Sequence, residues 1–182
     1  ATSGSWELVT VSGMKKSPEQ HREQSVSIPT RMGHPLGGTL FVPEQPLGQA
    51  MVISSATGML QKFYFVFARH FASRGYTVLT FDYSGIGASG GTPEALRRNR
   101  SNLIAWGAND QAGAVAYLKG RFPDAQITLV THSIGGQLCG FNPEHRHIDR
   151  IIMAASQNSY WNYFKGWHRL KMWAFWNIMI PW

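Results

Sequence analysis

Short hydrophobic runs alternate with helical patterns along most of the chain. Four apolar runs are bounded by small or polar residues, as is typical of strands buried in a parallel sheet. They lie at Met51–Ser54, Thr77–Phe81, Ile127–Thr131 and Arg150–Ala154, after two weaker strand-like runs at Ser25–Ile28 and Gly38–Val42. Helical patterns cover Gln61–Arg74, Ala108–Lys119 and Ile134–Cys139. This alternation predicts an α/β fold, with a mostly parallel sheet and flanking helices.

The helical pattern at Gln61–Arg74 has an aromatic side. Phe63, Phe67 and Phe71 recur on one face at helical spacing. Gly75 follows the pattern and is expected to end the helix.

The composition divides the chain into three parts. Residues 1–24 are polar without a pattern and are interpreted as an N-terminal extension, whereas residues 25–157 form the α/β core. Residues 158–182 differ, because Tyr160–Trp182 holds nine aromatic residues, including five of the seven tryptophans. The uncharged run Met172–Trp182 is shorter than the roughly 20 residues that cross a bilayer.

Composition and charge exclude several classes of protein. With 43% apolar, 13% aromatic and 15% charged residues, the 182-residue chain is not of the disordered class. Its one cysteine, Cys139, excludes an intramolecular disulfide framework and a cysteine-based zinc cluster. The net charge of +7 is scattered, and the one cluster, residues 97–100, lacks interleaved aromatics, so we expect no nucleic-acid partner. Residues 1–24 hold no secretory apolar segment, which indicates a cytoplasmic protein.

The strand Ile127–Thr131 leads into a turn that can carry chemistry. Residues Thr131–Gly135 have the form small-x-Ser-x-Gly, with Thr131 larger than the usual glycine, and a helical pattern follows. Small residues are needed there because larger side chains would collide across so tight a turn. Such a turn lifts the Ser133 hydroxyl clear of the sheet and brings backbone N–H groups near it. Ser133 is therefore a candidate nucleophile, and the alternative is an ordinary Ser–Gly turn.

The turn after the strand Met51–Ser54 is a candidate for part of an oxyanion hole. Around a serine turn of this kind, the loop after that strand supplies one N–H and the residue after the serine supplies the other. We assign these two donors to Met59, in the segment Ala56–Met59, and to Ile134. The alternative for Ala56–Met59 is an ordinary glycine turn.

A third turn, Gly85–Gly90, matches the G-x-G-x-x-G pattern of dinucleotide-binding proteins. It follows the strand Thr77–Phe81, as such a motif should. A helix should open within the motif, however, and Gly91-Thr92-Pro93 intervenes. Dinucleotide binding is therefore the less favoured interpretation.

These segments together resemble the α/β-hydrolase superfamily, in the branch that contains serine aminopeptidase-like and monoacylglycerol-lipase-like enzymes. Three stretches carry the resemblance, namely residues 57–90, 131–136 and 150–164. The resemblance implies that Ser133 is the nucleophile, that Met59 and Ile134 form the oxyanion hole, and that Asp82 belongs to a structural turn. It also implies that the aromatic tail begins a cap after the sixth strand, and that no metal or organic cofactor is needed.

The acid of a catalytic triad has no candidate in this sequence. A serine nucleophile needs a base and an orienting acid, which in this fold follow in the order Ser, Asp or Glu, His. After Ser133 the acids are Glu144 and Asp149, and both precede the strand Arg150–Ala154. We therefore expect a chain truncated before the last strands of the sheet, and the alternative is a degenerate hydrolase without activity.

The histidines do not supply an obvious base either. His145 and His147 precede the strand Arg150–Ala154, on the side away from the serine, and His168 lies in the tryptophan-rich segment. His132 neighbours Ser133, but adjacent side chains on an extended backbone point apart.

Two functions remain open. The first is a serine hydrolase, or its nucleophile-bearing part, that cleaves an ester or amide of a small, apolar acyl substrate through an acyl-enzyme on Ser133. The second is a non-catalytic module that binds a membrane surface or a partner. It rests on Lys165, Arg169 and Lys171, which interleave with tryptophans as at a lipid interface.

Overall fold

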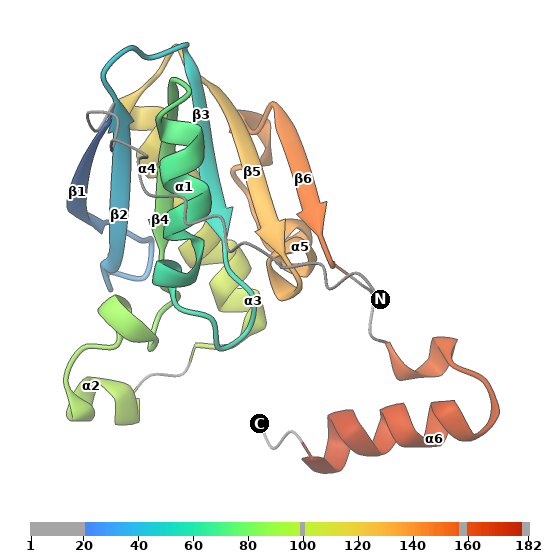
Figure 1. Cartoon of the computed structure of the whole chain (residues 1–182). Coiled ribbons are helices and arrows are strands. Elements are labelled where there is room, and N and C mark those ends of the chain that lie inside the picture. The colour runs from blue at the N-terminus through green and yellow to red at the C-terminus, as the bar shows by residue number, and fades with distance from the viewer. Residues whose placement is uncertain (1–20, 99–100, 157–159, 180–182) are drawn as a thin grey trace, which may run out of the picture.

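A six-stranded sheet forms the centre of the computed structural model, which describes residues 21–98, 101–156 and 160–179 (Figure 1). The strands are β1 (His21–Ile28), β2 (Leu36–Pro43), β3 (Gln49–Ser54), β4 (Tyr76–Phe81), β5 (Gln126–His132) and β6 (Arg150–Ala154). Their order in the sheet is β1-β2-β4-β3-β5-β6. The β1–β2 and β2–β4 pairs are antiparallel, whereas β4, β3, β5 and β6 pair in parallel. The predicted α/β fold with a mostly parallel sheet is confirmed.

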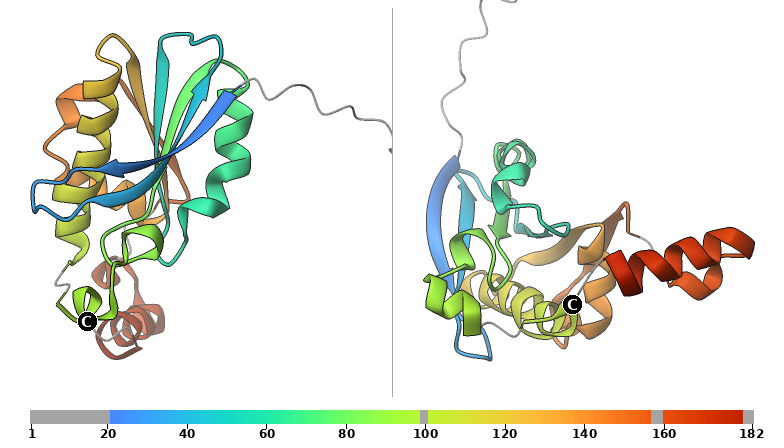
Figure 2. Two further views of the ribbon diagram at one scale, coloured as in Figure 1. Left: turned by 90° about the vertical axis from the view of Figure 1, so that its left-hand side faces the viewer. Right: turned by 90° about the horizontal axis from the view of Figure 1, so that it is seen from below.

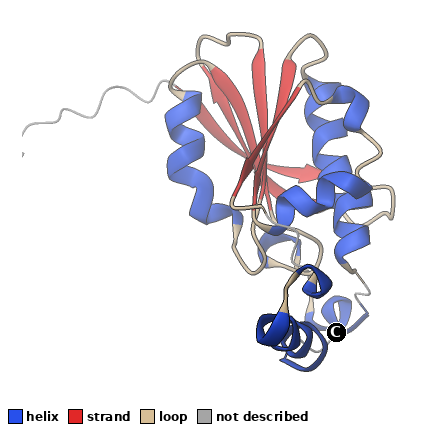
Figure 3. Ribbon diagram, turned by 90° about the vertical axis from the view of Figure 1, so that its right-hand side faces the viewer, coloured by secondary structure: helices blue, strands red, loops and turns tan. Residues whose placement is uncertain are grey.

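Helices cover both faces of the sheet (Figures 2 and 3). The α-helices are α1 (Phe65–Ala72), α2 (Pro93–Arg98), α3 (Leu103–Ala105), α4 (Ala112–Arg121), α5 (Ile134–Leu138) and α6 (Gly166–Ala174). Short 3-10 turns lie at Gln61–Tyr64, Gly87–Ser89, Cys139–Phe141, His145–His147 and Trp161–Tyr163, and π-helical turns at Trp106–Gln111 and Phe175–Met179. Helix α1 packs on one face of the sheet and α4 on the other.

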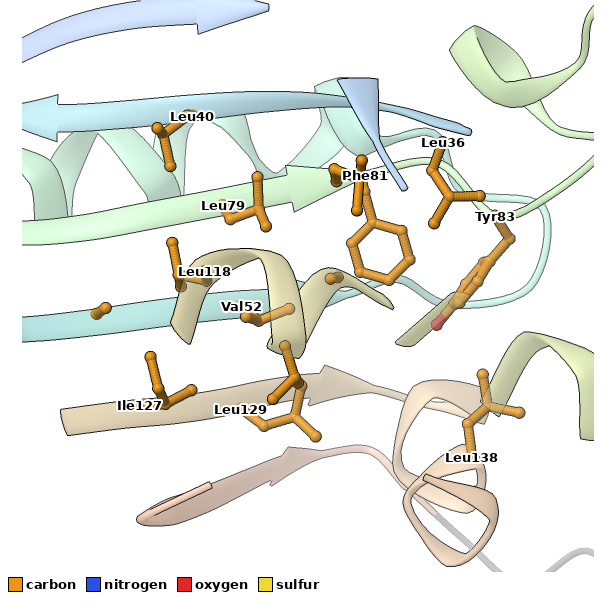
Figure 4. Packing of buried hydrophobic residues seen from close by; sticks show 14 of the residues in the cluster. Leu36, Leu40, Val52, Leu79, Phe81, Tyr83, Leu118, Ile127, Leu129 and Leu138 are labelled. Atoms are coloured by element: carbon orange, nitrogen blue, oxygen red, sulfur yellow. The ribbon is translucent and has the colours of Figure 1, made fainter. Parts of the chain in front are cut away.

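Alternation along the inner strands builds two hydrophobic clusters. Val52 of β3 and Leu79 of β4 face α4 and pack with Leu118 (Figure 4). Met51 and Val78, the preceding residues of the same strands, face α1. Because successive side chains point to opposite faces, a strand covered on both sides is apolar throughout. This explains why the inner strands were visible in the sequence as continuous apolar runs.

The first strand begins earlier than the sequence indicates. It starts at His21, so residues 21–24 belong to the sheet rather than to the predicted extension 1–24, whose residues 1–20 lie outside the described residues. The side chains of residues 22–25 are exposed, since β1 is an edge strand, and no apolar run marks it. Glu23 accepts a hydrogen bond from Arg69 Nε at 2.6 Å, which ties this edge to α1.

The aromatic side of the helical pattern faces the sheet only in part, since Phe71 packs against the buried cluster under α1. Tyr64, Ala68 and Ala72 are buried, whereas the side chains of Phe63 and Phe67 are 63% and 41% exposed. Small alanines let the helix approach the sheet closely, which favours that face. The helix ends at Ala72, and Gly75 at φ +90° turns the chain away, as predicted.

Strand β6 leaves one edge of the sheet open. All five of its residues are exposed, including Ile151, Ile152 and Met153, which are 46%, 52% and 55% exposed. In the described part of the chain, β5 is its one strand neighbour. An apolar strand of this kind is typical of the interior of a sheet rather than of an edge.

The aromatic tail lies apart from the sheet. Helix α6 is set off on the side to which the carboxyl ends of β3, β5 and β6 point (Figures 1 and 2). Its main contacts are with its own flanking turns, Trp161–Tyr163 and Phe175–Met179. None of the helices in the described ranges is both long enough and apolar enough to cross a membrane.

Candidate active site

Ser133 occupies a strained turn between a strand and a helix. Strand β5 ends at His132, α5 begins at Ile134, and Ser133 between them has φ +52° and ψ −114°. Positive φ is rare for a residue with a side chain, and such strain concentrates at functional sites. Ser133 is one of two non-glycine residues with positive φ in the described ranges, the other being Ala155, which follows the neighbouring strand β6.

Close packing explains why glycines follow Ser133. A Cβ atom at Gly135 would lie 2.6 Å from the carbonyl oxygen of Ser54, at the end of β3. A Cβ at Gly136 would collide with Ser156 and would lie 3.2 Å from the Thr131 hydroxyl. Thr131, larger than the glycine usual at its position, is thus accommodated because the facing residue is Gly136. Its hydroxyl donates to the Ile152 carbonyl at 3.3 Å.

Main-chain hydrogen bonds fix the turn to the sheet. The Ser133 N–H donates to the carbonyl of Ala154 at 2.9 Å, which ties the turn to β6. The Gly136 N–H donates to the Ser133 carbonyl at 3.1 Å, which closes the first turn of α5.

A buried network of side chains hydrogen-bonds to the Ser133 turn. Gln111, in the π-helical turn before α4, donates through Nε2 to the Gly135 carbonyl and to Ser54 Oγ, both at 2.9 Å. Asn142 donates to Gln111 Oε1 at 3.0 Å, and the Tyr83 hydroxyl lies 2.7 Å from Ser54 Oγ. Gln111 was not among the residues predicted from the sequence. Its signal was a glutamine next to the run of small residues that opens a helix, and π-helical turns are frequent at functional sites.

The loop after β3 leaves the sheet beside Ser133. Ser54 and Thr131 pair in the β3–β5 register, so both chains leave the sheet at the same edge. In the loop, the Met59 N–H donates to the Ala56 carbonyl at 3.1 Å and Gly58 has φ +71°. The predicted donor Met59 is therefore engaged within its own turn, and its role stays a prediction. Among the described residues, no acceptor faces the amides of Thr57 and Gly58.

The second predicted donor, Ile134, is the first residue of α5. The first N–H groups of a helix have no partner within the helix. Accordingly, no acceptor for the Ile134 amide lies in the part of the chain that the structure describes. The amide is free to bind an oxygen beside Ser133.

The His132 side chain hydrogen-bonds to a tyrosine. Its Nδ1 lies 2.9 Å from the hydroxyl of Tyr64, and the two rings are edge to face with centroids 6.0 Å apart. The Tyr64 oxygen also accepts the N–H of Ala56 at 2.9 Å. The expectation that His132 is not the base agrees with this arrangement. Tyr64 was missed, because the sequence does not show that it reaches from one turn to the other.

Asp82 organises the glycine-rich turn. Its carboxylate accepts the N–H groups of Gln61 at 2.7 Å and of Ala88 at 2.9 Å, and is buried. A Cβ at Gly87 would lie 2.5 Å from that carboxylate. The Asp82 carboxylate thus binds the Ala88 N–H, a backbone donor that a bound phosphate would need in a dinucleotide site. In addition, the motif opens a short 3-10 turn, Gly87–Ser89, where a dinucleotide site has a long helix. The turn is structural, as the resemblance implied.

The downstream acids are bonded to other groups. Glu144 pairs with Arg31, in the turn between β1 and β2, and with His147. Asp149 accepts the N–H of Ile127, near the start of β5, at 2.7 Å, at the opposite end of the sheet from Ser133. A strand of seven residues places that end about 20 Å from Ser133. His168 lies exposed on α6. In the described ranges, no carboxylate or imidazole hydrogen-bonds to the Ser133 hydroxyl.

The chain matches the family model of the alpha/beta hydrolase fold over residues 51–174. No curated protein matches it. Among solved structures, a thermostable carboxyl esterase from Bacillus coagulans is 16% identical with a TM-score of 0.62, the match covering 72% of this chain and 43% of that one. A hypothetical protein from Pseudomonas aeruginosa is 22% identical with a TM-score of 0.61, and the match covers 82% of this chain and 48% of that one. A serine hydrolase without lid from Xanthomonas campestris is 18% identical with a TM-score of 0.55, and the match covers 75% of this chain and 62% of that one.

The chain spans less than half the length of the first two of these structures. At identities below 25%, the likeness shows the fold alone. The family model, in contrast, covers most of the chain, including the Ser133 turn and the loop after β3. The chain belongs to the α/β-hydrolase-fold family.

Proposed function

We propose that the chain is the nucleophile-bearing part of a serine hydrolase that cleaves carboxylic esters or amides through an acyl-enzyme on Ser133. The observation that carries the proposal is the backbone of Ser133, held at φ +52° between β5 and α5. Bonds and contacts from three parts of the fold hold that strain in place: Ala154 of β6, Ser54 of β3 and Gln111.

In the proposed reaction, Ser133 Oγ attacks the acyl carbonyl carbon and the carbonyl oxygen becomes an oxyanion. The amides of Ile134 and of the Thr57–Met59 turn stabilise that oxyanion. A general base takes the Ser133 proton and passes it to the leaving alcohol or amine. The same base then takes a proton from the water that attacks the ester on Ser133, and returns it to Ser133 Oγ as the acid is released. We propose that the general base and its acid lie on polypeptide outside this sequence, since the match covers less than half of the first two solved structures.

An apolar acyl group suits the surroundings of the loop after β3. Leu60 and Phe63 flank the Ala56–Met59 turn and are 40% and 63% exposed. Helix α6, with its aromatic side chains, lies on the same side of the sheet (Figure 1). Exposed apolar groups around a nucleophile favour substrates that bury apolar surface against them.

Active-site labelling tests the proposal. The protein, expressed from its complete open reading frame, is treated with a fluorophosphonate and analysed by mass spectrometry. We expect one adduct, located on Ser133 and absent from Ser133→Ala. Ser73→Ala, which removes an exposed hydroxyl at the end of α1, should label like the unmodified protein. An unlabelled protein, or an adduct that persists in Ser133→Ala, would refute the mechanism.

The second candidate, a peripheral membrane module, is favoured by one observation on α6. Trp167, Leu170 and Ile178 are 64%, 51% and 65% exposed. Lys171 Nζ lies 5.8 Å from the centre of the Trp167 ring, and Arg169 lies similarly over Trp161. Cations beside exposed indoles suit an anionic lipid surface. Sedimentation with phosphatidylserine vesicles tests this: binding lost in Trp167→Ala, together with no labelling of Ser133, would favour this candidate.

A further inference from the structure

One hydroxyl joins the two halves of the proposed oxyanion site. The Tyr64 oxygen lies 2.9 Å from the Ala56 amide nitrogen, at the start of the turn after β3. The same oxygen lies 2.9 Å from Nδ1 of His132, the residue before Ser133. The ring of Tyr64 is buried, so water competes little for either bond.

The direction of the first hydrogen bond follows from the donor available. The Ala56 N–H donates to the Tyr64 oxygen, which leaves the phenolic hydrogen and a second lone pair to bond with His132 Nδ1. Because a phenol both donates and accepts, the bond to Nδ1 forms with either tautomer of His132. Burial raises the pKa of Tyr64, so the phenol keeps its proton.

Tyr64 itself is held on both sides. It ends the 3-10 turn Gln61–Tyr64, whose first N–H donates to buried Asp82 at 2.7 Å. Its ring packs edge to face against Phe63, with centroids 5.2 Å apart, and within the cluster under α1. The segment from Ala56 to Tyr64 is therefore a short loop fastened at Asp82 and closed by the Tyr64–Ala56 bond.

We propose that Tyr64 is a positioning residue, whose hydroxyl holds the Ala56–Met59 turn against the end of β5 at a fixed place relative to Ser133. This inference rests on the proposed function. Without the hydroxyl, the Ala56 amide and His132 Nδ1 lose their shared partner, and the turn is free to move with its amides. A displacement of about 1 Å at a reacting centre costs up to about 100-fold in rate.

Tyr64→Phe removes the oxygen and keeps the buried ring. In the protein from the complete open reading frame, we expect the rate of fluorophosphonate labelling, and kcat for a p-nitrophenyl ester, to fall about 10- to 100-fold, with KM changed less than about threefold. Tyr117→Phe is the matched control, because it removes a hydroxyl whose one hydrogen-bond partner among the described residues is Arg121 of its own helix, and it should leave both rates unchanged.

Variants of His132 give a second measurement. Asparagine can accept the Tyr64 hydrogen bond through Oδ1, in place of Nδ1, whereas alanine cannot. We expect His132→Asn to keep most of the labelling rate and His132→Ala to lose about as much as Tyr64→Phe. In long-range ¹H–¹⁵N spectra, the chemical shift of His132 Nδ1 should differ between the unmodified protein and Tyr64→Phe.

The outcomes separate this inference from the proposed function. If the unmodified protein does not label, the proposed function fails and the inference falls with it. If it labels and folded Tyr64→Phe labels at the same rate, the inference alone is overturned. Equal rates for His132→Asn and His132→Ala would overturn it as well, including where Tyr64→Phe does not fold.

Discussion

Gly135 lies against Ser54 so closely that a Cβ atom on Gly135 would be 2.6 Å from the Ser54 carbonyl oxygen. The start of α5 can approach the end of β3 only because residue 135 has no side chain. The contact joins the proposed nucleophile turn to the strand that precedes the proposed oxyanion loop.

Gly135→Ala should therefore displace α5 and the Ser133 turn. We expect a loss of about 1–3 kcal/mol in the free energy of unfolding, typical of overpacking, and slower labelling of Ser133. Urea unfolding and labelling kinetics measure the two effects. Gly140→Ala is the control, since no atom of the described residues lies within 4 Å of a Cβ there. Equal effects at the two glycines would contradict the interpretation.

Gln111→Ala should break the buried network under the turn. The substitution leaves Ser54 Oγ, the Gly135 carbonyl and Asn142 without a bond from residue 111. Unsatisfied buried polar groups cost about 1–3 kcal/mol each, so we expect a loss of at least about 2 kcal/mol in urea unfolding. Gln126→Ala, which removes an exposed amide bonded to Gln49 and Arg150, should cost less than about 0.5 kcal/mol. A small loss for Gln111→Ala would show that water replaces its bonds.

Asp110 should make stability depend on pH. Burial raises the pKa of this carboxyl to about 6, although hydrogen bonds from Ser84 oppose the shift. In the unfolded chain the pKa is near 3.9, so between these values the folded state binds more protons. The contribution of Asp110 to the free energy of unfolding should therefore be fully present below about pH 4. It should be lost as the pH rises through about 6, which lowers the free energy of unfolding by about 2–3 kcal/mol.

Asp110→Asn tests this dependence, because an amide of the same shape can still bond to Ser84. Urea unfolding between about pH 4 and pH 7 should show a flatter profile for this variant than for the unmodified protein. Asp124→Asn, at an exposed position, should keep the original profile. Parallel profiles for all three proteins would mean that Asp110 titrates alike in the folded and unfolded states.

The open edge at β6 should make the 182-residue chain self-associate. Ile151, Ile152 and Met153 expose apolar surface beside unpaired main-chain groups, which is a template for strand pairing. Ile152→Lys should lower the apparent mass in light scattering at a given concentration. Met32→Lys is the control, because it changes a side chain that is 64% exposed in the turn between β1 and β2. It should leave the apparent mass unchanged. A monomeric unmodified chain would argue against association through this edge.

The sequence predicts the inner strands well and the edges poorly, for a physical reason. Residues 51–54 and 77–81 are covered on both faces, so burial makes them uniformly apolar. Strand β1 has exposed polar side chains, and its first four residues resembled a polar extension. The aromatic spacing in α1 did not show which face is buried, and the structure buries Ala68 and Ala72.

The candidate site was predictable where it is local. Ser133 and its glycines form a pattern within five residues, and the structure gives that turn positive φ. Gln111 and Tyr64 act through contacts with residues that are distant along the chain, which no spacing rule encodes. The bond from Met59 to Ala56 depends on how the loop closes, so the sequence could indicate the loop but not which amide is free.

The N–H of Ser133 donates to the carbonyl of Ala154, the last residue of β6, which has one strand neighbour among the described residues. Outermost strands fray more readily than inner ones, so the geometry of the proposed nucleophile is only as persistent as β6. A further strand paired with β6, from more polypeptide or from a binding protein, would reduce this fraying. The proposed acyl transfer would then depend on completion of the sheet, so that the two are coupled in one equilibrium.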